Sequence, residues 1–285
     1  MIAEFRTASP GDAARAGEIC YRAFKTISEQ HGFPPDFPDA QTAIGLFEYI
    51  TSRPDVHGVV AEMEGRVVGS NFLWKDYPVA GVGPITVDPA MQNSRIGRKL
   101  MERVLDHAFK EALPSVRLVQ AAYHNRSLSL YTRLGFTARE PLSVIQGAAP
   151  NVSMEGRAVR HATAADLGAA DALCRAVHGH ARAGALRAAL DEGAAMVVVR
   201  GSRITGYTTG IGFFGHAVGE TDEDVQALIA AASSYGGPGF LVPTRNATLM
   251  RWCLHHGLRI VMPMTLMTIG PYEEPKGAFL PSILY

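Results

Sequence analysis

The stretch that decides the fold reads Gly83-Pro84-Ile85-Thr86-Val87-Asp88-Pro89-Ala90-Met91-Gln92-Asn93-Ser94-Arg95-Ile96-Gly97-Arg98-Lys99-Leu100-Met101. A β-rich run stops at Pro89, a short polar loop follows, and apolar residues then recur at helical spacing from Leu100 to Phe109. This order predicts a buried strand at about 80–87 that leads through the loop into a helix at about 95–112.

The loop between this strand and this helix has the features of an anion-binding site. The N–H groups of a helix's first turn have no partners within the helix, and the helix dipole is positive there. Arg95, Arg98 and Lys99 add side-chain charge, and Gly97 lets a ligand approach the backbone closely. An ordinary strand-loop-helix connection with a solvated basic face has the same pattern, so this stretch alone leaves both interpretations open.

A second motif lies downstream and reads Asn125-Arg126-Ser127-Leu128-Ser129-Leu130-Tyr131-Thr132-Arg133-Leu134-Gly135-Phe136. Together the two stretches resemble the GNAT acetyltransferase superfamily. Its cofactor loop has the pattern Gln/Arg-x-x-Gly-x-Gly/Ala after a strand, which Gln92 and Gly97 match at the two ends. Its later signature, Asn-x-x-(Ala/Ser)-x-x-(Leu)-Tyr-x-x-x-Gly-Phe, matches the second motif at the expected distance. The resemblance covers about residues 55–145 well and the first 50 residues loosely.

One position departs from the family pattern. Arg95 stands where the middle glycine of the cofactor loop is usual, and an arginine adopts a positive φ angle far less readily than a glycine. The resemblance therefore does not specify the detailed backbone path of this loop, although the anion site itself is retained.

The resemblance implies an enzyme that uses acetyl-CoA. The chemistry of acetyl transfer then determines which groups the active site of such an enzyme must supply. Acetyl transfer to an amine needs a pyrophosphate cradle, an exposed strand edge along the pantetheine arm, an oxyanion donor and an acid for the departing thiolate. Tyr131 occupies the family's position for that acid, and Asn125 the position that contacts the cofactor arm. The expected cofactor-binding residues are Ile85, Thr86, Val87, Gln92, Asn93, Ser94, Arg95, Ile96, Gly97, Arg98 and Asn125.

Two points of the mechanism stay open in the sequence. Without the family pattern, the favoured interpretation of Tyr131 is a core aromatic residue on an amphipathic helix with its hydroxyl at the surface; the family pattern reverses that preference. The general base is not identified: four titratable residues lie in segments that could border the acceptor cleft, but each also fits a solvated or satisfied polar position, and an ordered water chain can replace a base. These four are His31, Glu48, His57 and Asp76.

Three weak echoes in the same order indicate two copies of one α/β module. The pattern Arg-x-Ala-x-x-x-Asp at residues 6–12 recurs at 160–166, a strand and its Gly-ended turn at 59–69 recur at 197–206, and the Asn125 motif is echoed from Asn246 to Leu258. Turn-forming residues 147–151 are the expected connection. We therefore expect an α+β fold of two GNAT-like domains, residues 1–147 and 157–285, each with a central, mostly antiparallel twisted sheet flanked by helices.

The second copy keeps the expected fold but lacks the features expected for pyrophosphate binding and for the catalytic acid. Its corresponding helix starts with Thr221-Asp222-Glu223-Asp224, and carboxylates at a helix N-terminus repel a pyrophosphate. Cys253 aligns with Tyr131, so the acid is missing too. The Gly-rich run at 206–215 is a weak nucleotide signal and favours a strand and a turn. The pairs His178 with His180 and His255 with His256 lack carboxylate or cysteine company at ligand spacing, so we expect no metal.

Composition narrows the classes of protein to which the chain can belong. The 285 residues are 47% hydrophobic and 19% charged, which is typical of a globular chain, and their net charge of zero disfavours nucleic-acid binding. No apolar run approaches the length of a membrane span, and the first residues lack a signal-peptide pattern. Three distant cysteines, Cys20, Cys174 and Cys253, fit reduced thiols in a cytoplasmic protein.

These observations lead to one functional expectation and one rival. The expectation is a cytoplasmic, acetyl-CoA-dependent N-acetyltransferase that acts on a primary amine, of a small molecule as first choice, by direct attack in a ternary complex. No nucleic-acid or membrane partner is expected, and a homodimer is left open. The rival is a non-catalytic regulatory protein that binds acyl-CoA and has no productive acceptor site.

Overall fold

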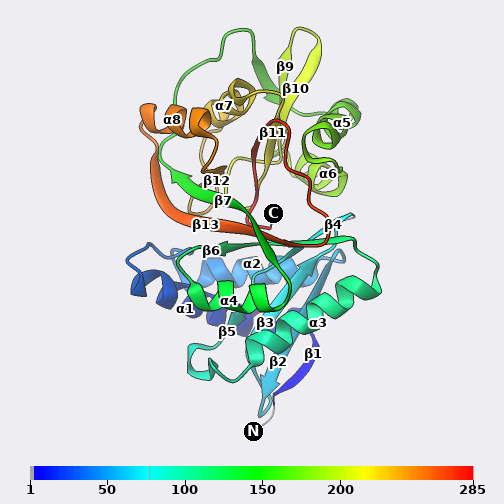
Figure 1. The fold of residues 1–285 in the computed structure, drawn as a ribbon, viewed down its shortest axis with the longest axis vertical. Coiled ribbons are helices and arrows are strands. Elements are labelled where there is room, and N and C mark those ends of the chain that lie inside the picture. Colours follow the sequence, from blue (N-terminus) through cyan, green and yellow to red (C-terminus); the bar gives the residue numbers. More distant parts are fainter. Residues whose placement is uncertain (1–2, 77, 285) are drawn as a thin grey trace.

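A computed structural model describes residues 3–76 and 78–284 (Figure 1). Its helices are α1 (Ala13–Gln30), α2 (Ala40–Ser52), α3 (Ile96–Lys110), α4 (Asn125–Arg133), α5 (Leu167–His178), α6 (Ala183–Asp191), α7 (Asp222–Ala231) and α8 (Ala247–His255). Its strands are β1 (Glu4–Thr7), β2 (Val56–Met63), β3 (Arg66–Trp74), β4 (Val79–Val82), β5 (Thr86–Val87), β6 (Ser115–Ala121), β7 (Thr137–Gln146), β8 (Ala158–His161), β9 (Met196–Arg200), β10 (Arg203–Thr208), β11 (Ala217–Gly219), β12 (Phe240–Pro243), β13 (Arg259–Ile269) and β14 (Ala278–Leu280). Short 3-10 turns are η1 (Pro10–Asp12), η2 (Pro89–Met91) and η3 (Ala164–Asp166). This is the α+β fold that the sequence predicts.

The strands form two sheets. The larger has the order β1-β2-β3-β4-β6-β13-β7-β12, with β5 paired to β3, and the smaller has the order β14-β11-β10-β9-β8. Among these named strands only β4 and β6 pair in parallel, and the other pairs are antiparallel. The prediction of twisted, mostly antiparallel sheets flanked by helices is confirmed.

The two halves of the chain exchange strands in the middle of the larger sheet. β13, near the end of the chain, lies between β6 and β7 of the first half, with Met264 opposite both Ala121 and Leu142. β7 in turn lies between β13 and β12 of the second half, with Leu241 opposite Val144. Figure 1 shows β13 in orange crossing the centre of the molecule beside the green β7. Each half therefore supplies a strand on which the other half depends for its pairing.

The repeated sequence pattern forms the same local structure in both halves. Arg6 donates two hydrogen bonds of 2.8 Å to the carboxylate of Asp12, and Arg160 does the same to Asp166 at 2.7 and 2.8 Å. In both places the aspartate also accepts the backbone N–H of the residue three positions earlier, at 2.8 Å. The two aspartates thus fix the turn from the first strand of each half into the helix that follows.

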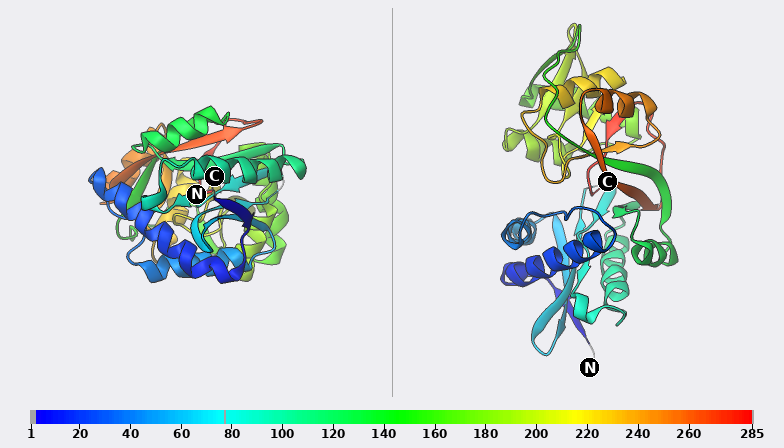
Figure 2. Two further views of the ribbon diagram at one scale, coloured as in Figure 1. Left: turned by 90° about the horizontal axis from the view of Figure 1, so that it is seen from below. Right: turned by 90° about the vertical axis from the view of Figure 1, so that its left-hand side faces the viewer.

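Helices of the first half cover both faces of its strands. α1 and α2 pack on one face through a cluster that contains Cys20, Phe47 and Phe72, and α3 packs on the other face through Leu100 and Val104. Figure 2 shows α1 and α2 on one side of the strands and α3 on the other. The connection from Gln146 to Ala158 holds no helix or strand. The domain limits 1–147 and 157–285 remain a prediction, since the shared sheet joins the two halves.

One predicted element is wrong in detail, and the error matters for the site. The strand expected at about 80–87 is two strands, β4 and β5, interrupted at Gly83-Pro84, because Pro84 has no N–H to donate to a ladder. β4 pairs with β6 from Val79 to Gly81, whereas β5 pairs only with β3. The chain therefore leaves β6 after β4, and a cleft opens between β5 and the second half of β6.

Candidate active site

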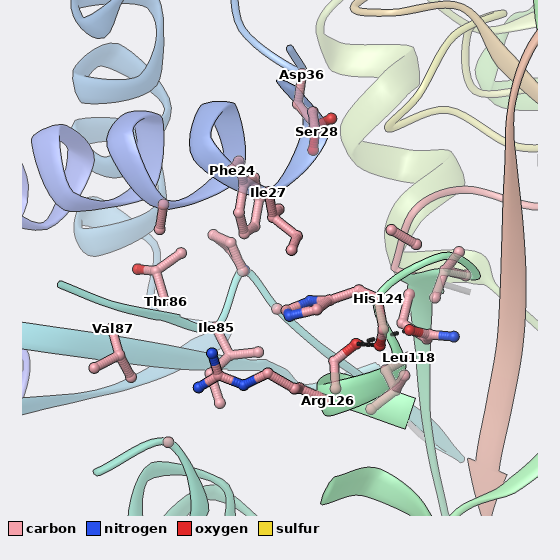
Figure 3. Close-up of a pocket in the computed structure, with 18 of the residues that line it drawn as sticks. Phe24, Ile27, Ser28, Asp36, Ile85, Thr86, Val87, Leu118, His124 and Arg126 are labelled. Carbon is pink, nitrogen blue, oxygen red and sulfur yellow. Dashed lines mark hydrogen bonds between the residues drawn. The ribbon is translucent and has the colours of Figure 1, made fainter. Parts of the chain in front are cut away.

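The cleft has a volume of about 1590 Å³. It is bordered by the end of α1 and the loop after it, by β5, by the loop before α3, by the end of β6, and by α4 (Figure 3). The second half of the chain contributes part of the wall through Phe213, Phe214, Gly237, Pro238, Met264, Ile283 and Leu284. Both halves therefore shape a single site.

The loop that leads into α3 is anchored at its start. The Asp88 carboxylate accepts hydrogen bonds from Arg15 at 3.1 Å and Arg22 at 2.9 Å, both on α1, and from the backbone N–H of Ala90 at 3.2 Å. At the other end Arg95 precedes α3 in the left-handed conformation, with φ at 64°. The arginine thus adopts the backbone shape for which the family uses glycine, at a cost of about 1 kcal/mol or more.

The first turn of α3 is open to an anion. The N-cap residue Arg95 makes no capping hydrogen bond with its side chain to the described residues, and the first turn of the helix contains no acidic residue. Gly97 lies in this turn and lines the cleft, where a Cβ atom would meet only Val87 Cγ2 at 3.6 Å and Leu130 Cδ2 at 4.0 Å. The glycine therefore leaves a space that any larger side chain would fill, which fits a ligand lying directly on the backbone.

Basic side chains surround this loop. Arg95 and Arg98 are exposed beside the cleft. Arg126, on α4, donates hydrogen bonds to Gln92 Oε1 at 3.1 Å and to Asn93 Oδ1 at 2.9 Å, so its guanidinium joins α4 to the loop. The positive charge and the free amides together favour a phosphate or pyrophosphate group at this end of the cleft.

Tyr131 forms part of the cleft wall and of the core at once. Its side chain is 6% exposed, and its ring packs edge-on against Phe136 with centroids 6.0 Å apart. Burial raises the pKa of Tyr131 well above its ordinary value, so the phenol holds its proton at neutral pH. The two sequence interpretations of this tyrosine, core residue and proton donor, are compatible in the structure.

The structure brings together nearly all of the predicted site residues. Ile85, Thr86, Val87, Gln92, Asn93, Ser94, Arg95, Ile96, Gly97, Arg98 and Tyr131 all line the cleft. Asn125 does not; it borders an adjoining hollow of about 340 Å³ with Arg126 and Arg133. Among the residues that line the cleft, none of the four base candidates His31, Glu48, His57 and Asp76 appears.

Several polar residues of the cleft escaped the sequence analysis, among them Ser28, Asp36, Tyr123 and His124. The hydroxyl groups of Ser28 and Tyr123 lie 3.2 Å apart. The pKa of His124 is lowered by burial, by Arg126 and by His31, so its imidazole is neutral near pH 7. Its place directly before the Asn125 motif was the signal for His124; Asp36 lies in a Pro-rich loop with no periodic pattern and had none.

The second half has no matching anion site among its described residues. At the N-terminus of α7, the Asp224 carboxylate accepts the backbone N–H of Thr221 at 3.1 Å and side-chain hydrogen bonds from Thr205 and Arg157. A carboxylate of the chain itself therefore occupies the position that α3 leaves open. Cys253, which aligns with Tyr131, is fully buried.

The described residues form neither a metal-ligand cluster nor a membrane-spanning helix. Residues 3–76 and 78–284 contain no group of three or more histidine, cysteine, aspartate or glutamate side chains placed to hold a metal ion. Within the same ranges, no helix has both the length and the apolar composition required to cross a bilayer.

The first half of the chain is similar to known acetyltransferases. Residues 21–136 match the acetyltransferase (GNAT) family model. Over 131 residues the chain is 32% identical to an IAA acetyltransferase of Azospirillum brasilense, an alignment that covers 45% of this chain and 85% of that protein.

Solved structures show the same fold over almost the whole chain. A Pyrococcus horikoshii protein described as an acetyltransferase superposes with a TM-score of 0.75 at 17% identity, covering 97% of this chain and 94% of its own. A tandem GNAT protein from the clavulanic acid biosynthesis pathway superposes with a TM-score of 0.57 at 13% identity, covering 95% and 100%. The chain therefore belongs to the GNAT family of N-acetyltransferases, in its tandem form.

Proposed function

We propose that this enzyme transfers the acetyl group of acetyl-CoA to a primary amine of a small molecule, by direct attack in a ternary complex. One observation carries the proposal: the cleft combines the open first turn of α3, the unpaired edge of β5 and the protonated phenol of Tyr131. The name of the Azospirillum brasilense relative, an IAA acetyltransferase, supports acetyl transfer as the reaction.

The residues present fit acetyl-CoA at one end of the cleft. The backbone N–H groups from Gln92 to Arg98 would hold the pyrophosphate, where Gly97 leaves room for it. The edge of β5 from Ile85 to Val87 would align the pantetheine arm, and one of its N–H groups would stabilise the oxyanion. Asn125 remains the expected contact for the cofactor arm from the adjoining hollow. Acetyl-CoA, when bound, supplies the thioester acetyl group.

Two side chains handle protons in this proposal. Tyr131 holds a proton on Oη that it would deliver to the leaving sulfur. His124 presents a neutral imidazole to the cleft, and its ring has no hydrogen bond or ion pair with any other described residue, so it is free to accept a proton from the acceptor amine. The acid and the base thus come from the same segment, on and directly before α4.

The second half would have a different task. Because Asp224 occupies the helix N-terminus that corresponds to the open one, we assign a single acetyl-CoA to each chain, in residues 1–147. Residues 157–285 would act as a wall that limits the length of the acceptor, through Phe213, Phe214 and Leu284.

A screen of primary amines tests the proposal. Purified enzyme is given acetyl-CoA and each amine in turn, release of free thiol is followed, and the product is identified by its mass. Amine-dependent thiol release together with an acetylated product is the expected result. Tight CoA binding without turnover on any amine would contradict the proposal and favour the regulatory protein instead.

A further inference from the structure

Asp36 is an unusual residue of the cleft, because its carboxylate finds no partner in the part of the chain that the structure describes. It lies in the loop between α1 and α2 and lines the cleft, and no described residue gives it a hydrogen bond or an ion pair. Other aspartates of this half are satisfied: Asp12 by Arg6, Asp39 by Thr42, and Asp88 by Arg15. The fold therefore does not use Asp36 for its own stability.

An unpaired, half-buried carboxylate costs folding free energy. Burial raises the pKa of Asp36 to about 6, so near neutral pH it carries a charge that its surroundings disfavour. A positive ligand group would remove this penalty, since opposite charges in a sheltered site attract strongly. The position is thus poised for a cation from outside the chain.

Asp36 lies away from the reacting centre. In the view of Figure 3 the side chains of Asp36 and Ser28 are drawn toward one end of the cleft, those of His124 and Ile85 toward the other, and that of Ile27 between them. The acetyl group would be held beside β5, and His124 would meet the reacting nitrogen. A cation at Asp36 is therefore a second positive group of the acceptor, not the amine that reacts.

The walls between these ends are apolar and aromatic. Phe24 stacks on Phe37 with centroids 6.4 Å apart, and Tyr123 stacks on Phe33 at 4.3 Å. Phe213, from the second half, packs in the same cluster as Phe33 and Tyr123. Aromatic faces accept both alkyl chains and cations, so these side chains suit an apolar spacer that ends in a positive group.

We infer that the acceptor is a doubly cationic amine, in which an apolar spacer separates the primary amine that is acetylated from a second ammonium or guanidinium group that pairs with Asp36. This inference rests on the proposed function and specifies its substrate class. Asp36 is then the residue that selects the acceptor, while Tyr131 and His124 serve the transfer.

The test compares α,ω-diaminoalkanes with n-alkylamines of the same chain length. For the wild-type enzyme we expect kcat/KM to be at least about tenfold higher for the diamine at the preferred length, since one paired charge in a sheltered site contributes that much or more. In Asp36→Asn the KM of the diamine should rise until the two amines are equal, with the KM of acetyl-CoA unchanged. Asp39→Asn is the matched control: it removes an equal charge three residues away, outside the cleft, and should keep the preference.

The outcomes separate this inference from the proposed function. Equal use of diamine and monoamine by the wild type, or a preference that survives in Asp36→Asn, would overturn the role of Asp36 while leaving amine acetylation established. Failure to acetylate any amine would contradict the proposed function itself. A thermal unfolding scan of Asp36→Asn shows whether the variant is folded, and at neutral pH its midpoint should not fall, because a disfavoured charge has been removed.

Discussion

Tyr131 shows how one residue serves the core and the cleft together. Its ring packs in the apolar cluster under α3 and α4, while its side chain also borders the cleft. The same burial that holds the ring keeps the phenol protonated, as the proposed role of proton donor requires. At the scale of this single residue, the same burial serves both the packing of the core and the protonation of the phenol.

Tyr131→Phe should lower kcat by about 10²–10⁴-fold and change CoA affinity little, because it keeps the ring and removes only the proton donor. The comparison is Tyr21→Phe, on α1 and outside the cleft, which should keep wild-type kcat. Steady-state kinetics across the pH range give both values. A kcat that matches the wild type at every pH would remove Tyr131 from the mechanism.

Gly97→Val should weaken CoA binding by about 10²-fold or more without unfolding the protein. A Cβ at Gly97 meets only ordinary van der Waals contacts, so the chain tolerates the side chain, which then occupies the space left for the pyrophosphate. Gly45→Val is the matched control, since Gly45 also lies in a helix with open space around it but does not line the cleft. Calorimetric titration with CoA measures the difference, and equal affinities for Gly97→Val and the wild type would place the pyrophosphate elsewhere.

Asp36→Asn should also change the dependence of stability on pH. Because the folded protein has a pKa of about 6 at Asp36, above the ordinary value, the folded state holds the proton more tightly, and this stabilising contribution is lost as the pH rises through about 6. At neutral pH the variant should be more stable by about 1 kcal/mol, a gain reduced by the solvent that reaches the carboxylate from the cleft. Near this carboxylate the other titratable groups are Cys20 and Tyr123, both uncharged at neutral pH. Urea unfolding at pH values on either side of 6 provides the measurement, and an unchanged pH profile would contradict the expectation.

At the scale of elements, the strand-to-helix turns at Asp12 and Asp166 have the same local structure. Each aspartate pairs with an arginine six residues earlier and accepts the backbone N–H of a Ser or Thr three residues earlier. The pKa of Asp12 is lowered to about 2, first by Arg6, and that of Asp166 is lowered first by Arg160. The two turns are therefore equivalent in their hydrogen bonds as well as in their sequence.

Asp166→Ala should therefore cost about 1–2 kcal/mol of stability at neutral pH, with a similar cost for Asp12→Ala, because each change removes a turn contact and a partly exposed ion pair. Since both pKa values are depressed, the contribution is present above about pH 4 and is lost as the pH falls through the folded values. Urea unfolding at neutral and acidic pH checks this. If the two costs differed severalfold, the turns would not be equivalent.

The N-termini of α3 and α7 explain the expected stoichiometry. α3 begins after an uncapped, left-handed Arg95, whereas α7 begins with Thr221 and the buried carboxylate of Asp224. We expect one CoA to bind per chain in a calorimetric titration of the full-length protein. Two sites of equal affinity would show that the second half also binds the cofactor.

At the scale of the whole molecule, the shared sheet makes the two halves depend on each other. β13 lies between β6 and β7, so removing the second half exposes a long edge on both strands. Residues of the second half also complete the cleft wall. A cut at the connection therefore divides one folding unit, although the sequence pattern marks two modules.

A fragment of residues 1–150 should accordingly precipitate or unfold without cooperativity, and co-expression with residues 151–285 should restore a soluble, active complex. Size-exclusion chromatography and near-UV circular dichroism report on the fold, and thiol release reports on activity. A soluble fragment that unfolds cooperatively and transfers acetyl as fast as the full chain would show that β13 is dispensable.

Local pattern was sufficient for much of this protein. The spacing of apolar residues predicts the helix at about 95–112, which the structure has as α3, because amphipathic periodicity depends on near neighbours in the chain. The two motifs around Gly97 and Tyr131 were enough to predict the family, and three weak echoes taken together, the Arg-to-Asp spacing among them, predicted a tandem chain. Each of these signals lies within a few residues of the structure that it specifies.

Tertiary structure decided the features that depend on distant partners. β13 pairs with β6 on one side and with β7 on the other. Its own residues do not select these two partners, because they fit a half-buried strand of any sheet. Pro84 interrupts the strand, but the tertiary structure decides the partners of its two parts: β4 pairs with β3 and β6, whereas β5 pairs with β3. Asp36 resembles any loop aspartate in the sequence. Only the packing of α1 and of the segment after β6 near it shows that its carboxylate is sheltered and unpaired among the described residues, because desolvation depends on the surrounding atoms and not on the neighbouring residues in the sequence.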